Sequence, residues 1–333
     1  NSVSAIQLLF RIRSDSGESI SVQELFAAPT VCGIAATISA RSARTSQNGA
    51  QVIESDGYEI ICLQAGSSDE VPLLLFNPAG ATGLCYSDLS EHLDGKYPVY
   101  CLDDGAILKN VERNESSIDA VAEKCLPLVV KFASAYGCVL SGRNSPDSAV
   151  KKVVLGGWSY GGVVATVVAE KLSSTPTLTR YNVDDACSLE IAGIVLFDAP
   201  LRNGSSNLND MQSADENATA DDVRSWINQF HGQSEELSTE KTVASHFSYC
   251  TSLLRRFYER QKRERPLLSC PVLDIRASQS SYNCSVEDVE EVSSGVISTH
   301  KTAGSHFTML FGKNTAGVAK LVKNSIDSWR NVL

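Results

Sequence analysis

The chain has 333 residues, 43% of them hydrophobic, which is enough to fill a substantial core without disulfides to stabilise it. Its net charge of −10 comes from dispersed acidic residues, so a nucleic-acid partner is not expected. No apolar run reaches the roughly 18–20 residues of a membrane span, and ten cysteines without a C-x-x-C pair favour free thiols in a cytoplasmic protein over a disulfide framework.

Residues 1–41 are predicted to be helical. Apolar residues recur at helical spacing over 3–12, 22–26 and 29–39. These short helices contain too few apolar residues for an independent core. Residues 42–57 are small, polar and without periodicity, which is typical of a linker. We therefore expect a domain boundary in this linker.

The first 39 residues resemble the C-terminal part of an acyl or peptidyl carrier domain of nonribosomal peptide and polyketide synthases. The resemblance covers a stretch that follows the double glycine of the phosphopantetheine motif and two later helices: Asn1–Leu8, Ile20–Phe26 and Pro29–Ala35. It implies that 1–41 is a partial carrier domain in which Ser2 carries the phosphopantetheine arm. Taken alone, Ser2 is equally consistent with a helix N-cap.

From Tyr58 to the end of the chain, apolar strands alternate with helices. Strands are predicted over 60–63, 73–76, 99–102, 153–155, 191–197 and 272–275, and helices over 117–135 and 317–333. Apolar strands separated by helices imply a mostly parallel sheet that is buried on both faces. We therefore expect an α/β-hydrolase fold over 58–333.

A G-x-S-x-G motif interrupts the apolar run around residue 155. Gly157, Ser159 and Gly161 lie between a predicted strand and a predicted helix. A side chain at either glycine would collide across a turn this tight, and the turn exposes the serine Oγ at the edge of the sheet. We expect Ser159 to be a nucleophile and the Tyr160 N–H, at the start of the helix, to stabilise an oxyanion. The alternative is a structural glycine turn.

A serine nucleophile needs a base and an acid that orients the base, in the chain order Ser, acid, His. His306 follows the last predicted strand, between a glycine and an apolar run, and the other histidines lack that setting (His92, His231, His246 and His300). Asp198 ends the strand 191–197, at the carboxyl edge where active sites of parallel sheets lie. The rival acids are Glu287 and Asp288, because Asp274 falls within a strand.

Two further segments bear on the predicted site. The small residues after the strand 73–76 would let backbone approach a substrate, so the Ala79 N–H is the expected second oxyanion donor. The stretch of about 203–265 breaks the alternation of strands and helices, and it is predicted to be a helical lid.

Residues 58–333 resemble the thioesterase domains that end nonribosomal peptide and polyketide synthases. The similarity is carried by Gly157–Gly162, by Gly304–Met309 around the histidine, by Pro72–Tyr86 around the oxyanion segment and, more loosely, by Leu196–Pro200. Asn77 and Thr82 depart from the residues that are usual there.

These resemblances imply a serine thioesterase without metal. It would release an acyl or peptidyl chain from a carrier domain of the same polypeptide by hydrolysis or macrocyclisation, with Ser159, Asp198 and His306 as the triad. The alternatives are a stand-alone esterase or editing type II thioesterase, and a non-catalytic scaffold that docks carriers.

Overall fold

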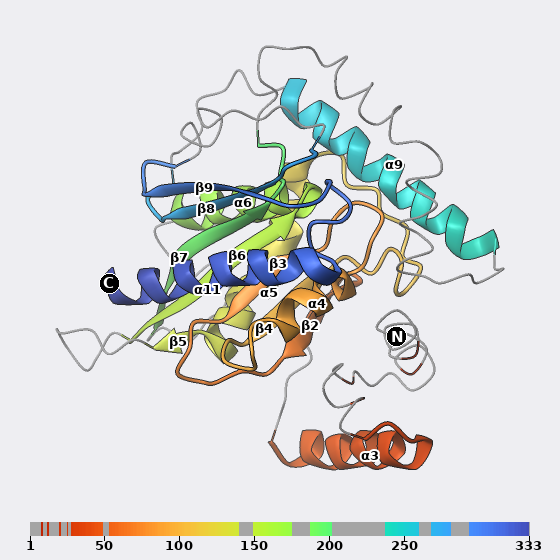
Figure 1. Cartoon of the computed structure of the whole chain (residues 1–333). Helices are drawn as coiled ribbons and strands as arrows, with labels where there is room; N and C mark the ends of the chain where they lie inside the picture. Colours follow the sequence, from red (N-terminus) through yellow and green to blue (C-terminus); the bar gives the residue numbers. More distant parts are fainter. Residues whose placement is uncertain are drawn as a thin grey trace.

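A computed structural model describes residues 28–48, 53–139, 149–174, 187–201, 237–259, 268–280 and 293–332, together with Leu8, Ile12, Ile20 and Leu25. The described residues form one nine-stranded sheet in the order β1-β2-β4-β3-β6-β7-β8-β9, with β5 paired to β6 (Figure 1). The strands are β1 Glu54–Ser55, β2 Tyr58–Gln64, β3 Leu73–Phe76, β4 Val99–Asp103, β5 Cys138–Val139, β6 Ala149–Trp158, β7 Cys187–Phe197, β8 Val272–Ala277 and β9 Ile297–Thr302.

From β4 to β9 the main path of the sheet is parallel, whereas β2 pairs with β4 antiparallel. The chain moves from β3 outward to β4 and then returns past β3 to β6. The carboxyl ends of β3 and β6 therefore border the point where the winding direction reverses, which is where parallel sheets form their binding crevice.

Helices cover both faces of the sheet, which explains the apolar strands. They are α4 Ser87–Glu91, α5 Ile118–Tyr136, α6 Tyr160–Ser174, α9 Leu237–Glu259 and α11 Thr315–Val332, with 3-10 turns η1 Gly83–Tyr86 and η3 Gly312–Asn314. A further helix, α3 Val31–Asn48, belongs to the N-terminal segment. Side chains of α5, α6 and α9 share one apolar cluster, and those of α4 and α11 share the other (Figure 1). The predicted α/β-hydrolase fold is confirmed.

The segment before the sheet differs from the expectation. The structure continues α3 to Asn48, because no glycine or proline lies between Gly33 and Gly49. β1 then pairs with β2 through a tight turn in which Asp56 and Gly57 both have positive φ. Regular structure therefore extends into both ends of the predicted linker 42–57, which itself stays a prediction.

The described residues of the N-terminal segment have a small cluster of their own. Ile20 and Leu25 are buried against Ile34 and Ile38 of α3, and this cluster is separate from both clusters of the sheet. The separation is compatible with the predicted division of the chain, which stays a prediction.

Two further features bear on the composition. The eight cysteines whose side chains the structure describes are free thiols. None of the helices in the described part of the chain combines the length and apolar character needed to cross a bilayer.

Candidate active site

Ser159 lies in a strained turn between β6 and α6. Its φ is +54°, a region that few residues other than glycine adopt, and its side chain is buried. Its carbonyl accepts the N–H groups of Gly162 and Val163 at 3.0 and 3.4 Å, which starts α6 directly after the serine. The structure thus gives Ser159 the strand-turn-helix setting that the G-x-S-x-G spacing predicted.

The flanking glycines make this turn possible. A Cβ on Gly157 would lie 2.4 Å from the carbonyl carbon of Gly161, and a Cβ on Gly161 would lie 2.2 Å from the carbonyl oxygen of Phe76. Real Cβ atoms do not approach other atoms so closely. The two glycines therefore allow α6 to sit directly against the ends of β3 and β6.

Asp198 and His306 form a buried pair at the same edge of the sheet. The Nδ1 atom of His306 lies 2.7 Å from Oδ2 of Asp198, and both side chains are more than nine-tenths buried. The carboxylate also accepts the Ala277 N–H at 3.1 Å and the Ser280 hydroxyl at 2.6 Å. These contacts fix the carboxylate, which in turn orients the imidazole.

The backbone places this pair beside Ser159. The Ser159 N–H donates to the Phe197 carbonyl at 3.0 Å, and Asp198 is the next residue. The Asp198 N–H donates to Ile275 of β8 at 2.7 Å. The centroid of the His306 ring lies 5.8 Å from that of the Trp158 ring, and Trp158 directly precedes Ser159. The structure therefore joins Asp198 to His306 and places Asp198 on the strand end that accepts the Ser159 N–H.

Two of the other candidates lie in the strands β8 and β9. His300 lies in the edge strand β9. Asp274 lies within β8 and pairs with Arg276 at 2.6 Å. Four other candidates lie outside the described residues: Ser2, His231, Glu287 and Asp288. The same holds for residues 203–236 and 260–265 of the predicted lid.

The predicted oxyanion segment forms a turn, residues 78–81, at the end of β3. The Ala81 N–H donates to the Pro78 carbonyl at 3.4 Å, and Gly80 has a φ of +69°, whereas Ala79 is not among the residues with positive φ. These features identify a type II turn, which requires positive φ at its third residue. Ala79 is therefore the second residue of the turn, and Tyr160 begins the neighbouring helix α6.

Tyr86 connects the two elements that carry the predicted oxyanion donors, and the sequence analysis gave it no such role. Its hydroxyl donates to the Phe76 carbonyl at 2.6 Å and accepts the Trp158 N–H at 2.8 Å. Burial raises the pKa of Tyr86 well above its ordinary value, so the hydroxyl keeps its proton. No local pattern marks such a role, because both partners are backbone atoms of distant residues.

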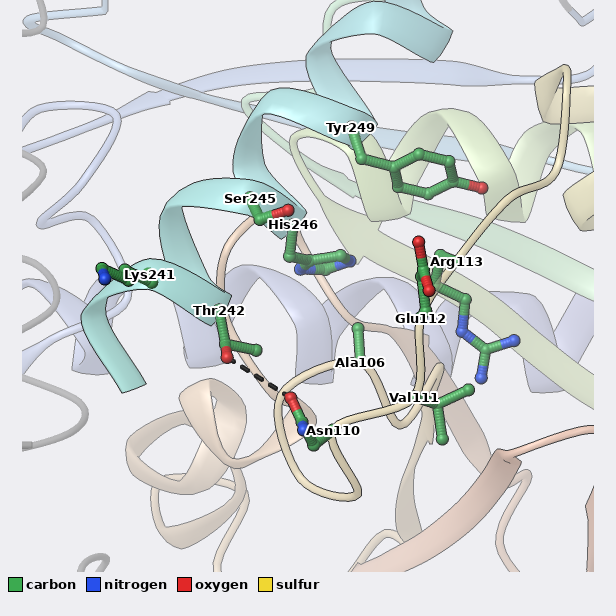
Figure 2. Close-up of a pocket in the computed structure, with 10 residues that line it drawn as sticks. All are labelled: Ala106, Asn110, Val111, Glu112, Arg113, Lys241, Thr242, Ser245, His246 and Tyr249. Carbon is green, nitrogen blue, oxygen red and sulfur yellow. Dashed lines mark hydrogen bonds between the residues drawn. The ribbon is translucent and has the colours of Figure 1, made fainter. Parts of the chain in front are cut away.

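A second buried histidine was also missed, because the sequence placed His246 only within a lid. Its Nε2 atom lies 2.8 Å from Oδ2 of Asp104, and its Nδ1 atom lies 3.1 Å from the Gly80 nitrogen. His246 is in the wall of a cavity of about 450 Å³ between α9 and the segment that connects β4 to α5 (Figure 2). Thr242 and Asn110, which both line this cavity, are joined by a 3.4 Å hydrogen bond (Figure 2).

Within the described part of the chain, no three His, Cys, Asp or Glu side chains are grouped as a metal site would require.

No family model matches the chain. Among curated proteins, it is 26% identical over 175 residues to a "Dimodular nonribosomal peptide synthase" of Bacillus subtilis (strain 168), a match that covers 52% of this chain and 6% of that protein. The chain thus corresponds to a small part of that relative.

Solved structures with the same fold include thioesterase domains. The Vlm2 thioesterase domain, solved with a bound dodecadepsipeptide, has a TM-score of 0.52 at 17% identity, covering 80% of this chain and 96% of that one. A four-domain nonribosomal peptide synthetase, AB3403, has a TM-score of 0.56 at 17% identity, covering 96% of this chain and 23% of that one. The homologues are thus nonribosomal peptide synthetases, and the fold is that of their thioesterase domains.

Proposed function

We propose that this chain is a thioesterase that releases an acyl or peptidyl chain from a carrier domain through an acyl-enzyme on Ser159. The observation that carries the proposal is the buried Asp198–His306 pair, 2.7 Å between Oδ2 and Nδ1, beside a serine held at φ +54°. The relatives support a thioester as the substrate, because nonribosomal peptide synthetases hold their intermediates on carrier domains.

In the first half of the reaction, Ser159 Oγ attacks the thioester carbonyl carbon. His306 takes the hydroxyl proton on Nε2, since its Nδ1 faces Asp198. Asp198 holds the ring in this tautomer and stabilises the imidazolium that forms. When the tetrahedral intermediate collapses, the C–S bond breaks and His306 gives the proton to the leaving thiol, which leaves an ester on Ser159.

In the second half, water or a hydroxyl or amine of the bound chain attacks that ester. His306 removes the proton of the attacking group and returns it to Ser159 Oγ, which yields a free acid or a ring. The N–H groups of Ala79 and Tyr160 stabilise the oxyanion in both halves. First-turn N–H groups of a helix lack partners within the helix, which suits the Tyr160 N–H at the start of α6 to this role. The Ala79 N–H comes from the type II turn at 78–81.

The remaining parts of the proposal concern the substrate's carrier. We place a partial carrier domain at 1–41 with phosphopantetheine on Ser2, upstream synthase modules as partners, a helical lid around α9 and a cytoplasmic location. The four-domain synthetase supports the carrier assignment, because it covers 96% of this chain whereas the isolated Vlm2 domain covers 80%. The free thiols support a reducing compartment.

Ser159→Ala tests the mechanism with an acyl-pantetheine thioester as substrate. We expect kcat to fall by about 10³-fold or more, because the nucleophile is lost. Ser248→Ala is the matched control, since this exposed serine lies on α9 away from the triad. Wild-type rates in Ser159→Ala would contradict the proposal. A wild-type chain that neither hydrolyses the thioester nor reacts with a fluorophosphonate would favour the non-catalytic scaffold.

A further inference from the structure

Helix α9 packs against α5 and α6 and carries a continuous buried face. The buried residues follow helical spacing at Val243, His246, Cys250, Leu253, Leu254, Phe257 and Tyr258. All but one of these are apolar or a thiol. His246 is the exception, and it is only 4% exposed. A buried imidazole on an otherwise apolar helix face needs polar partners, which the surrounding loops supply.

The partners of His246 come from two different loops at the carboxyl edge of the sheet. Nε2 lies 2.8 Å from Oδ2 of Asp104, just after β4, and Sγ of Cys250 lies 3.2 Å from the same nitrogen. Nδ1 lies 3.1 Å from the Gly80 nitrogen, which is the donor in that contact. Nδ1 must therefore present a lone pair, and the proton must be on Nε2, where Asp104 accepts it.

The Gly80 N–H belongs to the central peptide group of the 78–81 turn. This group is what distinguishes a type II turn from a type I turn, because the two differ by rotation of that single peptide. An acceptor placed opposite the Gly80 N–H selects one orientation. The neighbouring peptide group, which contains the Ala79 N–H, belongs to the same turn, so an anchor at Gly80 also limits its movement.

We infer that His246 is a positioning residue for the oxyanion hole: held by Asp104, it accepts the Gly80 N–H and so fixes the turn that presents the Ala79 N–H to the substrate. This inference rests on the proposed thioesterase function. It makes α9 part of the catalytic architecture, because a residue of this helix aligns one of the donors.

The charge of His246 is central to the inference. Burial lowers the pKa of His246 and the Asp104 carboxylate raises it, so the carboxylate alone would favour a charged ring. The Gly80 N–H opposes protonation, since an imidazolium has no lone pair to accept it. The inference requires the neutral form with its proton on Nε2, and ¹⁵N NMR of the histidine ring nitrogens measures this directly at the assay pH. A doubly protonated ring in the active protein would overturn it.

Two substitutions separate the two nitrogens of His246. In His246→Asn, the side-chain oxygen reaches the position of Nδ1 and still accepts the Gly80 N–H. In His246→Gln, the longer amide reaches Asp104 instead, and the acceptor for Gly80 is lost. We expect His246→Gln to lower kcat by about tenfold or more with little change in KM, because an oxyanion donor is misaligned. His246→Asn should retain more of the wild-type kcat, even where both variants lose similar thermal stability.

Equal kcat values in His246→Gln and the wild type would overturn the inference. It would also be overturned if kcat fell equally in His246→Gln and His246→Asn, in proportion to their loss of stability. Ser248→Ala again controls for substitution on α9. A second measurement does not depend on activity: the Gly80 amide proton should exchange faster in His246→Gln than in His246→Asn, and equal exchange would count against the inference. If the wild-type chain cleaved no thioester, the proposed function would fail while this measurement still tested the contact.

Discussion

At the scale of single residues, Tyr86 shows how one hydroxyl connects two halves of a site. It bonds the Phe76 carbonyl at the end of β3 and the Trp158 N–H at the end of β6. Both strand ends lead directly into the segments that carry the proposed oxyanion donors. The distance between those donors therefore depends in part on a side chain that does not itself take part in the chemistry.

Tyr86→Phe removes this connection without changing the shape of the ring. We expect the free energy of unfolding to fall by about 2 kcal/mol, because a buried N–H and a buried carbonyl lose their partner. We expect kcat to fall with it, and urea unfolding combined with thioester kinetics measures both effects. Tyr136→Phe, at the half-buried end of α5, is the control and should change neither value strongly.

Residues differ in how well the sequence predicts them. Ser159 and His306 were found because glycines and apolar residues next to them in the chain give a local pattern. Tyr86 and His246 were not, because each contacts a backbone N–H far along the chain, 72 and 166 residues away. A hydrogen bond to a backbone group does not depend on which residue carries that group, so no sequence motif indicates it.

At the scale of elements, the contact between α6 and β3 depends on Gly161. A Cβ there would lie 2.2 Å from the Phe76 carbonyl oxygen, which belongs to the backbone of β3. Because a backbone atom cannot rotate away as a side chain can, any substitution must move the helix or the strand. Moving either one shifts the nucleophile turn relative to the 78–81 turn.

Gly161→Ala should therefore lower the free energy of unfolding by about 3 kcal/mol and nearly abolish thioester cleavage. Gly317→Ala is the opposite case: Gly317 lies in helix α11, and the nearest atom outside that helix to its Cβ would be Thr302 Oγ1, at 3.9 Å. That substitution should leave activity intact and raise stability by about 0.5–1 kcal/mol. Chemical unfolding of both variants checks the contrast, and similar effects would contradict the steric argument.

The elements also show where sequence patterns stop being informative. The buried strands were found as apolar runs, although β6 and β7 extend several residues further toward their N-terminal ends. The edge strand β9 was missed because its sequence, Ile297–Thr302, is polar and its side chains are half-buried or exposed. An edge strand that faces solvent has no apolar periodicity to detect.

At the scale of the whole molecule, two adjacent buried carboxylates at the end of β4 affect stability. Asp103 accepts the N–H groups of Gly83 and Gly105, both at 2.8 Å, while Asp104 pairs with His246. Burial and the neighbouring charge of Asp104 raise the pKa of Asp103 to about 7. The folded chain therefore keeps a proton on Asp103 that the unfolded chain has already released.

This difference makes folding depend on pH. Between about pH 4 and pH 7 the unfolded state binds fewer protons at this position, so the contribution of Asp103 to the free energy of unfolding decreases as pH rises. Asp103→Asn has no titrating group here. We expect the free energy of unfolding of the wild type, minus that of Asp103→Asn, to decrease steadily as pH rises from about 4 to 7. Urea unfolding at a series of pH values measures this difference. A difference that is constant with pH would show that the pKa is not raised.

Three residues that follow strands share an arrangement that depends only on backbone. The N–H groups of Asn77, Ser159 and Asp198 donate to carbonyls of Leu102, Phe197 and Ile275, each on the adjoining strand. The distances between the strand ends that carry these residues are thus set by the roughly 4.8 Å between neighbouring strands. Side-chain identity at the accepting positions has no part in these bonds. Sequence can therefore drift far in evolution while the alignment persists, in agreement with a common fold at 17% identity.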